Sequence, residues 1–190
     1  KGGEMHYDVI SAFIKSVRGS DPNAAVYYLA RMLDGGEDPL FIARRLCILA
    51  AEDVGLANPN ALLLANSCFQ IVHNIGMPEA RIPLAELTIY LASSAKSNSA
   101  YKAINEAMAV AKDTQMASVP LYLRNAPTKL MDELGYGDGY KYAHDYPGHF
   151  ADLEFMPQGL EGHRFYEPDY NRHEEAFRAR LESLWPKYYK

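Results

Sequence analysis

The sequence has little cysteine and no long apolar run. Its 190 residues include only two cysteines, Cys47 and Cys68, which are too few for a disulfide framework. Both lie in apolar stretches, where a reduced thiol packs as a small hydrophobe, so we expect a cytoplasmic protein. No run of about 18 apolar residues occurs, which excludes a transmembrane helix and predicts no membrane partner. The opening Lys1–His6 does not resemble a signal peptide. The chain opens without Met, and we expect it to be part of a longer protein.

The sequence also lacks an excess of positive charge. Residues 1–129 carry 12 Lys and Arg against 12 Asp and Glu, whereas residues 130–190 carry 7 against 12. The whole net charge of −5 therefore comes from the last third. A nucleic-acid-binding domain usually has a basic face, because release of counterions from phosphates supplies much of its affinity. This balance argues against a chain that binds DNA tightly by itself.

Apolar residues recur at helical spacing through residues 1–117, which predicts an all-α domain. The run Val9–Val17 shows the pattern, with apolar residues at i, i+4 and i+8. Asp–Pro or Asn–Pro pairs at 21–22, 38–39 and 58–59 predict helix starts, because Asp and Asn cap helices and Pro suits the first turn. The unequal spacing of these pairs favours a compact helical bundle over a repeat array.

Two predicted helices are apolar on nearly every side. They cover Ala61–Ile75 and Leu84–Ala95, and helices of this kind are normally buried over most of their surface. Two interpretations stay open: the helices form the centre of one bundle, or part of their surface is buried against another subunit. The second interpretation suggests oligomer contacts at five positions, namely Leu63, Phe69, Ile71, Leu87 and Tyr90.

The sequence changes character near residue 118. Residues 118–190 are rich in Tyr, Pro and Gly, and they predict an irregular segment with a short helix at 128–134 and a terminal helix at 173–185. So many aromatic rings argue against a flexible linker. We expect the segment to wrap over the helices, with its rings buried and its hydroxyls at the rim.

Sequence signatures of catalysis are missing. There is no phosphate-binding loop or serine-nucleophile motif, and the glycines of Gly135–Gly139 follow a helix pattern rather than a strand. The adjacent pair Glu52–Asp53 would point about 100° apart on a helix, so the two carboxylates would not share a substrate. His144, Asp145 and His149 suit a divalent metal. They lack a rigid helical spacing, so structural histidines are the simpler interpretation and a metal hydrolase is an alternative.

Two polar clusters suggest anion contacts. Lys96–Tyr101 and Leu123–Lys129 each place small donors and a cation at a predicted helix start, where a phosphate or an acidic peptide can bind. Ordinary helix capping with a solvated cation is the simpler explanation of both. The binding interpretation names eight residues: Arg44, Arg45, Lys96, Ser97, Asn98, Arg124, Lys129 and Lys141.

Several motifs occur in the order that marks one family. They include Arg18–Pro22, Ala51–Leu56, Lys96–Tyr101, Leu123–Leu130 and His144–Gly148. Together they resemble the C-terminal region of the replication-associated recombination protein A family, also called MgsA and related to the Werner-helicase-interacting ATPase. The resemblance covers essentially the whole chain. It departs from the family pattern just before Lys96, where alanine replaces the usual proline.

The resemblance implies a role in assembly rather than catalysis. Family members are AAA+ ATPases akin to clamp loaders that act in recombination and repair at stalled replication forks. This chain would be their helical C-terminal domain, like the clamp-loader collar, and would form homotetramers. ATP and Mg²⁺ would bind an N-terminal region that this chain lacks, so the resemblance implies no catalytic, cofactor or metal residue here.

The resemblance also implies partners for the whole protein. These would be DNA and single-stranded-DNA-binding protein, in a cytoplasmic setting that is nucleoid-associated if the source is bacterial. An alternative function for this chain is a DNA- or acidic-peptide-binding module built on the basic residues named above.

Overall fold

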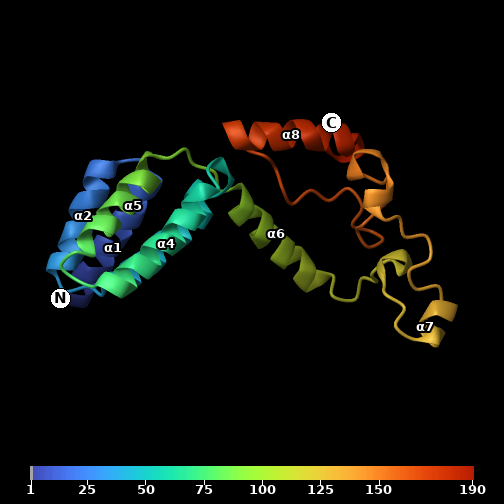
Figure 1. The fold of residues 1–190 in the computed structure, drawn as a ribbon, viewed down its shortest axis with the longest axis horizontal. Coiled ribbons are helices and arrows are strands. Elements are labelled where there is room, and N and C mark those ends of the chain that lie inside the picture. The colour runs from blue at the N-terminus through green and yellow to red at the C-terminus, as the bar shows by residue number, and fades with distance from the viewer. Residues whose placement is uncertain (1) are drawn as a thin grey trace. The chain divides into compact units, whose positions relative to one another are not determined.

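The chain folds into helices, turns and irregular segments in the computed structural model, which describes residues 2–190 (Figure 1). No β-strand forms within those residues, so the fold class is all-α, as expected. None of the helices in this part of the chain is long and apolar enough to cross a membrane. The helices are α1 (Gly2–Arg18), α2 (Pro22–Asp34), α3 (Pro39–Leu49), α4 (Asn60–Ile75), α5 (Arg81–Ser93), α6 (Ser99–Asp113), α7 (Lys129–Glu133), α8 (Arg172–Leu184) and α9 (Pro186–Tyr189).

Two of the three predicted Asx–Pro starts cap helices as expected. Asp21 accepts a hydrogen bond from a backbone N–H in the first turn of α2 at 2.9 Å, and Asp38 does the same for α3 at 3.0 Å. The third pair behaves differently, because no side chain caps α4. Asn58 instead donates its amide to the Tyr90 hydroxyl at 2.5 Å, which ties the start of α4 to α5.

Contacts group the chain into two units. The first unit comprises residues up to Ile104 together with Tyr166–Phe177, and the second comprises Asn105–Phe165 with Arg178–Lys190. Helices α6 and α8 therefore contribute residues to both units. The expected domain division into 1–117 and 118–190 stays a prediction, since grouping by contact does not measure where independent folding begins.

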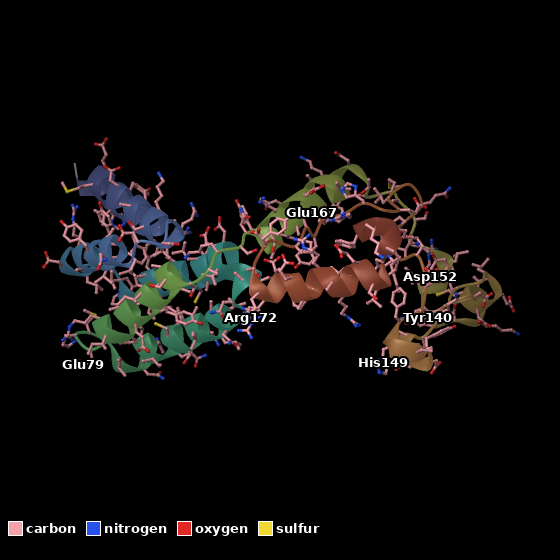
Figure 2. All side chains as sticks on the ribbon, turned by 90° about the horizontal axis from the view of Figure 1, so that it is seen from above. Glu79, Tyr140, His149, Asp152, Glu167 and Arg172 are labelled. Carbon is pink, nitrogen blue, oxygen red and sulfur yellow. The ribbon has the colours of Figure 1, made fainter. Side chains whose placement is uncertain are left out.

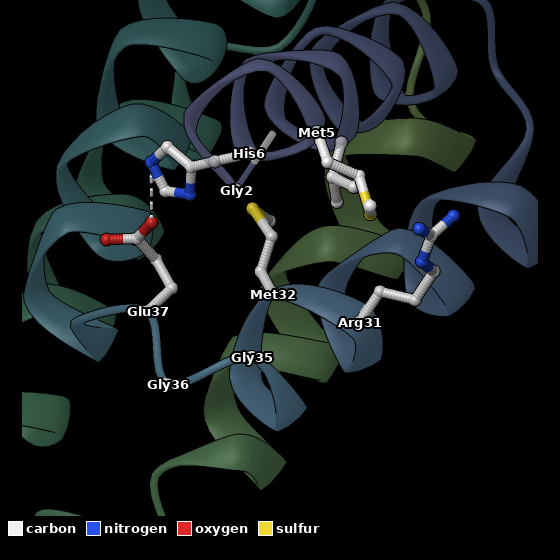
Figure 3. A pocket seen from close by; sticks show the side chains of 9 residues that line it. Gly2, Met5, His6, Arg31, Met32, Gly35, Gly36 and Glu37 are labelled. Carbon is white, nitrogen blue, oxygen red and sulfur yellow. Dashed lines mark ion pairs between the residues drawn. The ribbon is translucent and has the colours of Figure 1, made fainter.

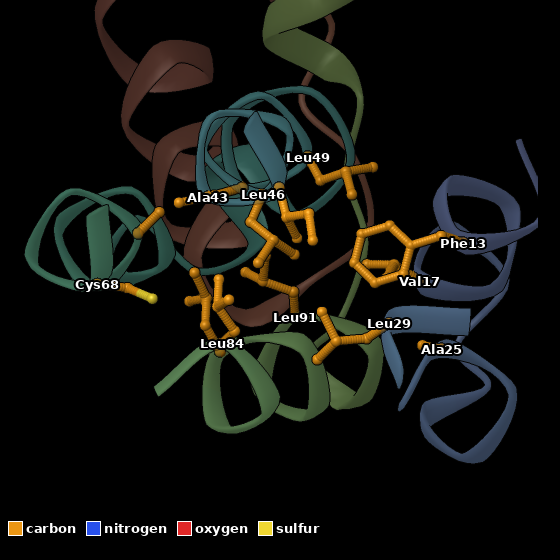
Figure 4. Packing of buried hydrophobic residues seen from close by; sticks show 14 of the residues in the cluster. Phe13, Val17, Ala25, Leu29, Ala43, Leu46, Leu49, Cys68, Leu84 and Leu91 are labelled. Carbon is orange, nitrogen blue, oxygen red and sulfur yellow. The ribbon is translucent and has the colours of Figure 1, made fainter. Parts of the chain in front are cut away.

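The core of the first unit lies among α1 to α5 (Figure 4). Helix α1 packs on α2, α3 packs on α4, and α5 packs on both α2 and α4. Burial of apolar surface, at about 25 cal/mol per Å², supplies the main force that holds these helices together. The largest fully buried apolar side chains are Phe13, Ile42, Leu46, Leu49, Leu84 and Leu91.

Helix α4 buries only one narrow face in this chain, so the interpretation that it forms the centre of one bundle is wrong, while burial against another subunit stays a prediction. Its buried residues are all small or medium in size: Ala61, Ala65, Cys68 and Val72. Small side chains let neighbouring helices approach closely, because little volume separates their backbones. The larger leucines and isoleucines of α4 face solvent instead. Helix α5 buries a broader face but also exposes Ile82 and Ile89.

Aromatic and polar contacts hold the second unit, which has almost no deep core. The Trp185 ring meets Phe150 edge-on and stacks on Tyr188, with centroid distances of 5.2 and 5.5 Å. Glu154 accepts a hydrogen bond from the Tyr188 hydroxyl. Among the described residues of this unit only Ala151 is fully buried. The expected burial of tyrosine rings is wrong for four residues of the irregular segment, which are exposed: Tyr140, Tyr142, Tyr146 and Tyr170.

The C-terminal helices lie close to where the sequence places them. Helix α7 falls within the predicted 128–134, and the Thr128 hydroxyl caps it by accepting from the Met131 N–H at 3.2 Å. Helix α8 begins one residue before the predicted 173–185 and ends one residue earlier. The short turn α9 that follows it lies beyond the predicted terminal helix and begins at Pro186, where proline suits the first turn.

Gly55 occupies a position that only glycine fits. Its φ is +50°, and a Cβ there would lie 2.6 Å from the carbonyl oxygen of Ser97. The Ser97 backbone is itself fixed, because its N–H donates to the Asp53 carbonyl at 2.8 Å. We expect Gly55→Ala to lower the free energy of unfolding by roughly 2 to 3 kcal/mol, through strain and steric clash together. Urea unfolding followed by circular dichroism measures this loss.

Gly36→Ala is the matched control for that substitution. Gly36 also has a positive φ, +82°, but a Cβ there would meet no atom within 4 Å. Its replacement should therefore cost only the backbone strain, about 1 kcal/mol. Equal losses in the two variants would contradict a close approach of Ser97 to Gly55.

Candidate functional site

An apolar groove of about 220 Å³ lies between α4 and α5, which run side by side (Figure 1). On α4 the lining residues recur at spacings of four and three, which places them along one face of the helix. We call this surface the α4–α5 groove, and its lining residues are Leu64, Ser67, Cys68, Ile71, Pro83, Glu86, Leu87 and Tyr90. Its walls are mainly hydrocarbon, so it suits an apolar side chain from another molecule.

Three of the five predicted oligomer contacts line this groove. Ile71 is 42% exposed at the rim, Leu87 is 4% exposed, and Tyr90 is half-buried. The other two lie elsewhere on α4. Leu63 is 69% exposed and does not line the groove, while Phe69 packs against the core beneath an arginine.

Further apolar side chains on α4, on α5 and between these helices are open to solvent. They are Leu62, Ile75, Met77, Ile82 and Ile89. A monomeric protein rarely leaves large contiguous apolar patches exposed, because their hydration is unfavourable. The concentration of such residues on two neighbouring helices marks this part of the first unit as a candidate contact surface.

Cys68 contributes to the groove as an apolar group. Burial raises the pKa of its thiol to about 11, so the thiol is neutral at physiological pH. The sulfur donates a hydrogen bond to the Pro83 carbonyl at 3.5 Å, which links α4 to α5. This environment suits packing rather than nucleophilic chemistry.

A second site surrounds the carboxylate of Glu174, which has no exposed surface. Five donors from two separate stretches of the chain reach it: the hydroxyls of Ser97, Ser99 and Tyr166, the side-chain amide of Asn171 and the backbone N–H of Asp169. The hydrogen bonds from Ser99 and Tyr166 measure 2.7 and 2.9 Å. Each oxygen therefore has more than one partner, which compensates for the loss of water.

The local sequence explains half of this arrangement. Asn171 caps α8 by accepting from the Glu174 N–H at 2.9 Å, and its own amide donates to the Glu174 carboxylate at 2.8 Å. This reciprocal pair resembles a capping box, except that Glu174 accepts from the Asn171 side-chain amide rather than from its backbone N–H. The spacing Asn-x-x-Glu is a recognisable signal for it, but neither residue was among the predicted site residues. The other half comes from the serines at the start of α6. Ser99 lies 75 residues before Glu174 in the sequence, so no local pattern predicts their contact.

Glu174 is charged at physiological pH. Burial by itself raises the pKa of this carboxyl, but hydrogen bonds from Ser97, Asn171, the Asp169 backbone and Ser99 outweigh it and lower the pKa to about 2. An anion therefore does sit at the start of α6, and it is a carboxylate of the same chain. Ser97 and Ser99 are buried around it, so in this structure they do not face an external phosphate.

Lys96 is tied into the same unit. Its ammonium donates to the Ser20 hydroxyl at 3.1 Å and to the carbonyls of Ala92 and Ser94 at 3.0 and 2.6 Å. Burial lowers the pKa of Lys96, and attraction to Asp53 opposes that effect. Three contacts match the three N–H donors of an ammonium group, so Lys96 fixes the chain between α5 and α6.

Three other predicted anion contacts also belong to the first unit. Arg44 is exposed on α3, with its guanidinium 5.6 Å from the centroid of the Phe69 ring. Arg45 is half-buried, and its Nε has no hydrogen-bond acceptor among the described residues. Asn98 is exposed between the two buried serines. Of these residues Arg44 and Asn98 are open to a partner.

The remaining predicted contacts lie in the second unit. Arg124 donates to a backbone carbonyl at 2.8 Å and lies 5.0 Å from the centroid of the Tyr136 ring. Lys129 is exposed and approaches Glu133 at 3.9 Å, a weak surface pair. Lys141 is exposed and donates to the Asp152 carbonyl at 3.2 Å. The structure gives each of these cations a partner within its own unit.

Glu52 and Asp53 both face one guanidinium. Arg18 Nε donates to Asp53 at 2.7 Å, and Arg18 Nη2 lies 3.6 Å from Glu52. Ala50–Val54 forms a π-helical turn, and the two carboxylates meet different nitrogens of the same guanidinium rather than a common substrate. Arg18 gains a raised pKa, chiefly from its hydrogen bond to Asp53. The pair therefore joins α1 to this turn and is not placed for acid–base chemistry.

The structure brings together two of the three residues suggested as metal ligands. The Nδ1 atoms of His144 and His149 lie 3.1 Å apart. Asp145 does not complete a triad, and no group of three or more His, Cys, Asp or Glu side chains within residues 2–190 could hold a metal ion. The metal-hydrolase alternative, which needs all three residues, is therefore not supported.

Another hollow, of about 360 Å³, lies between the start of α1 and the end of α2 (Figure 3). The ion pair between His6 and Glu37, at 3.0 Å, lies on its wall, and Met5 and Met32 supply apolar surface. No sequence motif pointed to these residues. His6 and Glu37 pair with each other, and the Arg31 guanidinium lies over the Tyr27 ring at 5.9 Å from its centroid, so the hollow presents no catalytic arrangement.

The fold and these sites define a class of protein module: a helical domain that surrounds a buried carboxylate with its own donors and presents an apolar groove. Comparison with known proteins gives the particular family. The family described as MgsA AAA+ ATPase C terminal matches residues 19–185. The chain therefore belongs to the C-terminal domain of the recombination-associated MgsA AAA+ ATPases.

Named relatives agree with this assignment. Replication-associated recombination protein A of Coxiella burnetii is 48% identical over 183 residues, which cover 96% of this chain and 42% of that protein. The protein of the same name from Bacillus subtilis is 43% identical over 187 residues, covering 98% and 44%. ATPase WRNIP1 of Dictyostelium discoideum is 42% identical over 168 residues, covering 88% and 19%. The chain thus spans less than half the length of these relatives.

Replacing Glu174 should destabilise the first unit strongly. Glu174→Gln removes the charge and replaces one acceptor oxygen with an NH2 group, a donor that faces other donors, so several buried donors lose their partner. We expect a loss of about 3 kcal/mol in the free energy of unfolding, measured with urea. Glu79→Gln, at an exposed position between α4 and α5, is the control and should change stability by less than about 0.5 kcal/mol. A similarly small change in Glu174→Gln would contradict a stabilising role for the five hydrogen bonds to Glu174.

Acid should remove the same stabilisation. The folded-state pKa of Glu174, about 2, lies below its ordinary value of 4.5, so on acidification the unfolded chain binds a proton first. The contribution of Glu174 is therefore complete above pH 4.5 and is lost as pH falls from 4.5 to about 2. The difference in unfolding free energy between wild type and Glu174→Gln should shrink across that window. A difference that does not change with pH would contradict the lowered pKa.

Proposed function

We propose that this chain is an assembly domain, which joins subunits of a AAA+ ATPase through the α4–α5 groove. The carrying observation is the reversed pattern of α4, which buries alanines and a cysteine and exposes leucines and isoleucines. A helix that only covered its own core would show the opposite distribution. Contact with another subunit removes these exposed side chains from water, at about 25 cal/mol per Å² of apolar surface.

A second copy of the chain is the proposed occupant of this surface. The groove is apolar at its centre and carries Glu86 and Ser67 among its lining residues, which is the arrangement of an apolar centre with polar groups beside it. Identical subunits pair most simply about a twofold axis, and two such pairings make a tetramer. We propose four subunits because the sequence resemblance implies that number.

The setting of this assembly is also a proposal. The relatives carry the name replication-associated recombination protein A, and this chain corresponds to their C-terminal part. We propose that the whole protein binds ATP and Mg²⁺ outside this chain and works on DNA with single-stranded-DNA-binding protein. In that scheme this domain sets the number and spacing of the ATPase subunits.

The proposal predicts that Ile71→Asp separates the subunits. Ile71 is partly exposed at the groove rim, so the charge is tolerated in a free subunit but becomes buried and unpaired in the assembly. We expect the dissociation constant to rise at least tenfold, which corresponds to about 1.4 kcal/mol. Sedimentation equilibrium across a concentration range measures it, starting from a wild-type mass near four times 21.3 kDa.

Leu63→Asp is the matched comparison on the same helix. Leu63 is more exposed than Ile71 but does not line the groove, so the variant should assemble like wild type. Dissociation by Leu63→Asp alone would move the interface to another face of α4. A wild-type chain that stays monomeric at high concentration would contradict the assembly role altogether.

A further inference from the structure

Two imidazole rings meet in an exposed turn of the second unit. His144 and His149 are both exposed, their ring centroids are 4.8 Å apart, and their Nδ1 atoms are 3.1 Å apart. At that distance both Nδ1 atoms cannot carry a proton, because two N–H groups would point at each other. At least one ring therefore presents a lone pair toward its neighbour.

The backbone of this turn is shaped to bring the rings together. Gly148 has φ +67°, and His149 follows with φ +56°, so two successive residues lie in the left-handed region. A histidine is seldom found there, and the conformation has an energetic cost. The turn reverses the chain within five residues, and Figure 2 marks His149 there, with Tyr140 in the preceding stretch. The Tyr142 ring lies beside His144 at 5.2 Å between centroids.

The spacing of the two Nδ1 atoms matches a pair of metal ligands. Two imidazole nitrogens at about 2.0–2.1 Å from one ion are separated by about 3.3–3.4 Å in a tetrahedral site and by about 2.9 Å at a right angle. The observed 3.1 Å lies between these values. The two Nδ1 atoms form a hydrogen bond with each other, so the rings must turn slightly to aim both lone pairs at one ion. Both rings are open to solvent, and they can turn without any rearrangement of the backbone.

We propose that His144 and His149 bind one first-row transition-metal ion through their Nδ1 atoms. Imidazole suits Ni²⁺, Cu²⁺ and Zn²⁺ better than Mg²⁺ or Ca²⁺, which take oxygen ligands. Since no third His, Cys, Asp or Glu of the described chain joins the pair, water fills the remaining positions. The site is thus an open two-histidine site without a hydrolytic triad, and it is independent of the α4–α5 groove.

The experiment is a calorimetric titration of the untagged chain with Ni²⁺, and separately with Zn²⁺. We expect one ion per chain in wild type. His144→Ala and His149→Asn should each weaken that binding at least tenfold. Asn is chosen at position 149 because it accepts a left-handed backbone, so the turn is kept while the ring is removed.

His73→Ala supplies the matched control, since His73 is an exposed histidine on α4 in the other unit. It should bind the ion like wild type. Nitrogen-15 NMR of the histidine rings gives a second readout, in which Zn²⁺ shifts the Nδ1 signals of two rings only. Absence of saturable binding overturns the proposal and leaves the pair as an N–H···N hydrogen bond that holds the turn. Ion binding that persists when His144→Ala and His149→Asn are combined in one chain overturns the proposal as well.

Discussion

The buried carboxylate of Glu174 is the constraint on which the architecture of the first unit depends. A charge with no exposed surface is tolerated only when hydrogen bonds replace its water, and five donors do so here. Those donors come from the start of α6 and from the residues that lead into α8. Residues 105–165 belong to the second unit. The hydrogen bonds to Glu174 therefore hold together the segments that come before and after this stretch in the sequence.

Neighbouring polar contacts connect the residues around Glu174 to the helical core. Gly55 admits the Ser97 carbonyl at a distance that no side chain allows, Lys96 bonds three oxygens around the end of α5, and Arg18 joins α1 to Asp53. Each contact satisfies a backbone or charged group that burial would otherwise penalise. The polar residues between α5 and α6 thus serve the interior, while the leucines and isoleucines of α4 face outward.

Local signals in the sequence predicted the helices well, and burial poorly. Asp21, Asp38 and Thr128 cap helices because a side chain and a backbone N–H a few residues away are enough to define a start. The exposed side of α4 was not predictable, since an apolar residue looks the same whether it meets its own core or another subunit. The π-helical turn at Ala50–Val54 was likewise not predicted from the sequence, nor was the contact of Glu52 and Asp53 with Arg18, which lies more than 30 residues earlier.

The motif around Lys96 shows which part of a site the sequence alone does not reveal. Small donors at a helix start are typical of an anion site, and here the anion is the carboxylate of Glu174. The source of the anion was not readable, because Glu174 lies 75 residues after Ser99 and only the folded chain brings it there. A sequence pattern that is typical of a site for an external anion can thus bind a side chain of the same protein. Because Ser97, Ser99 and Lys96 are committed to internal partners, they are not available to an external phosphate, and the exposed leucines and isoleucines of α4 remain as the feature of the first unit without an explanation inside the chain.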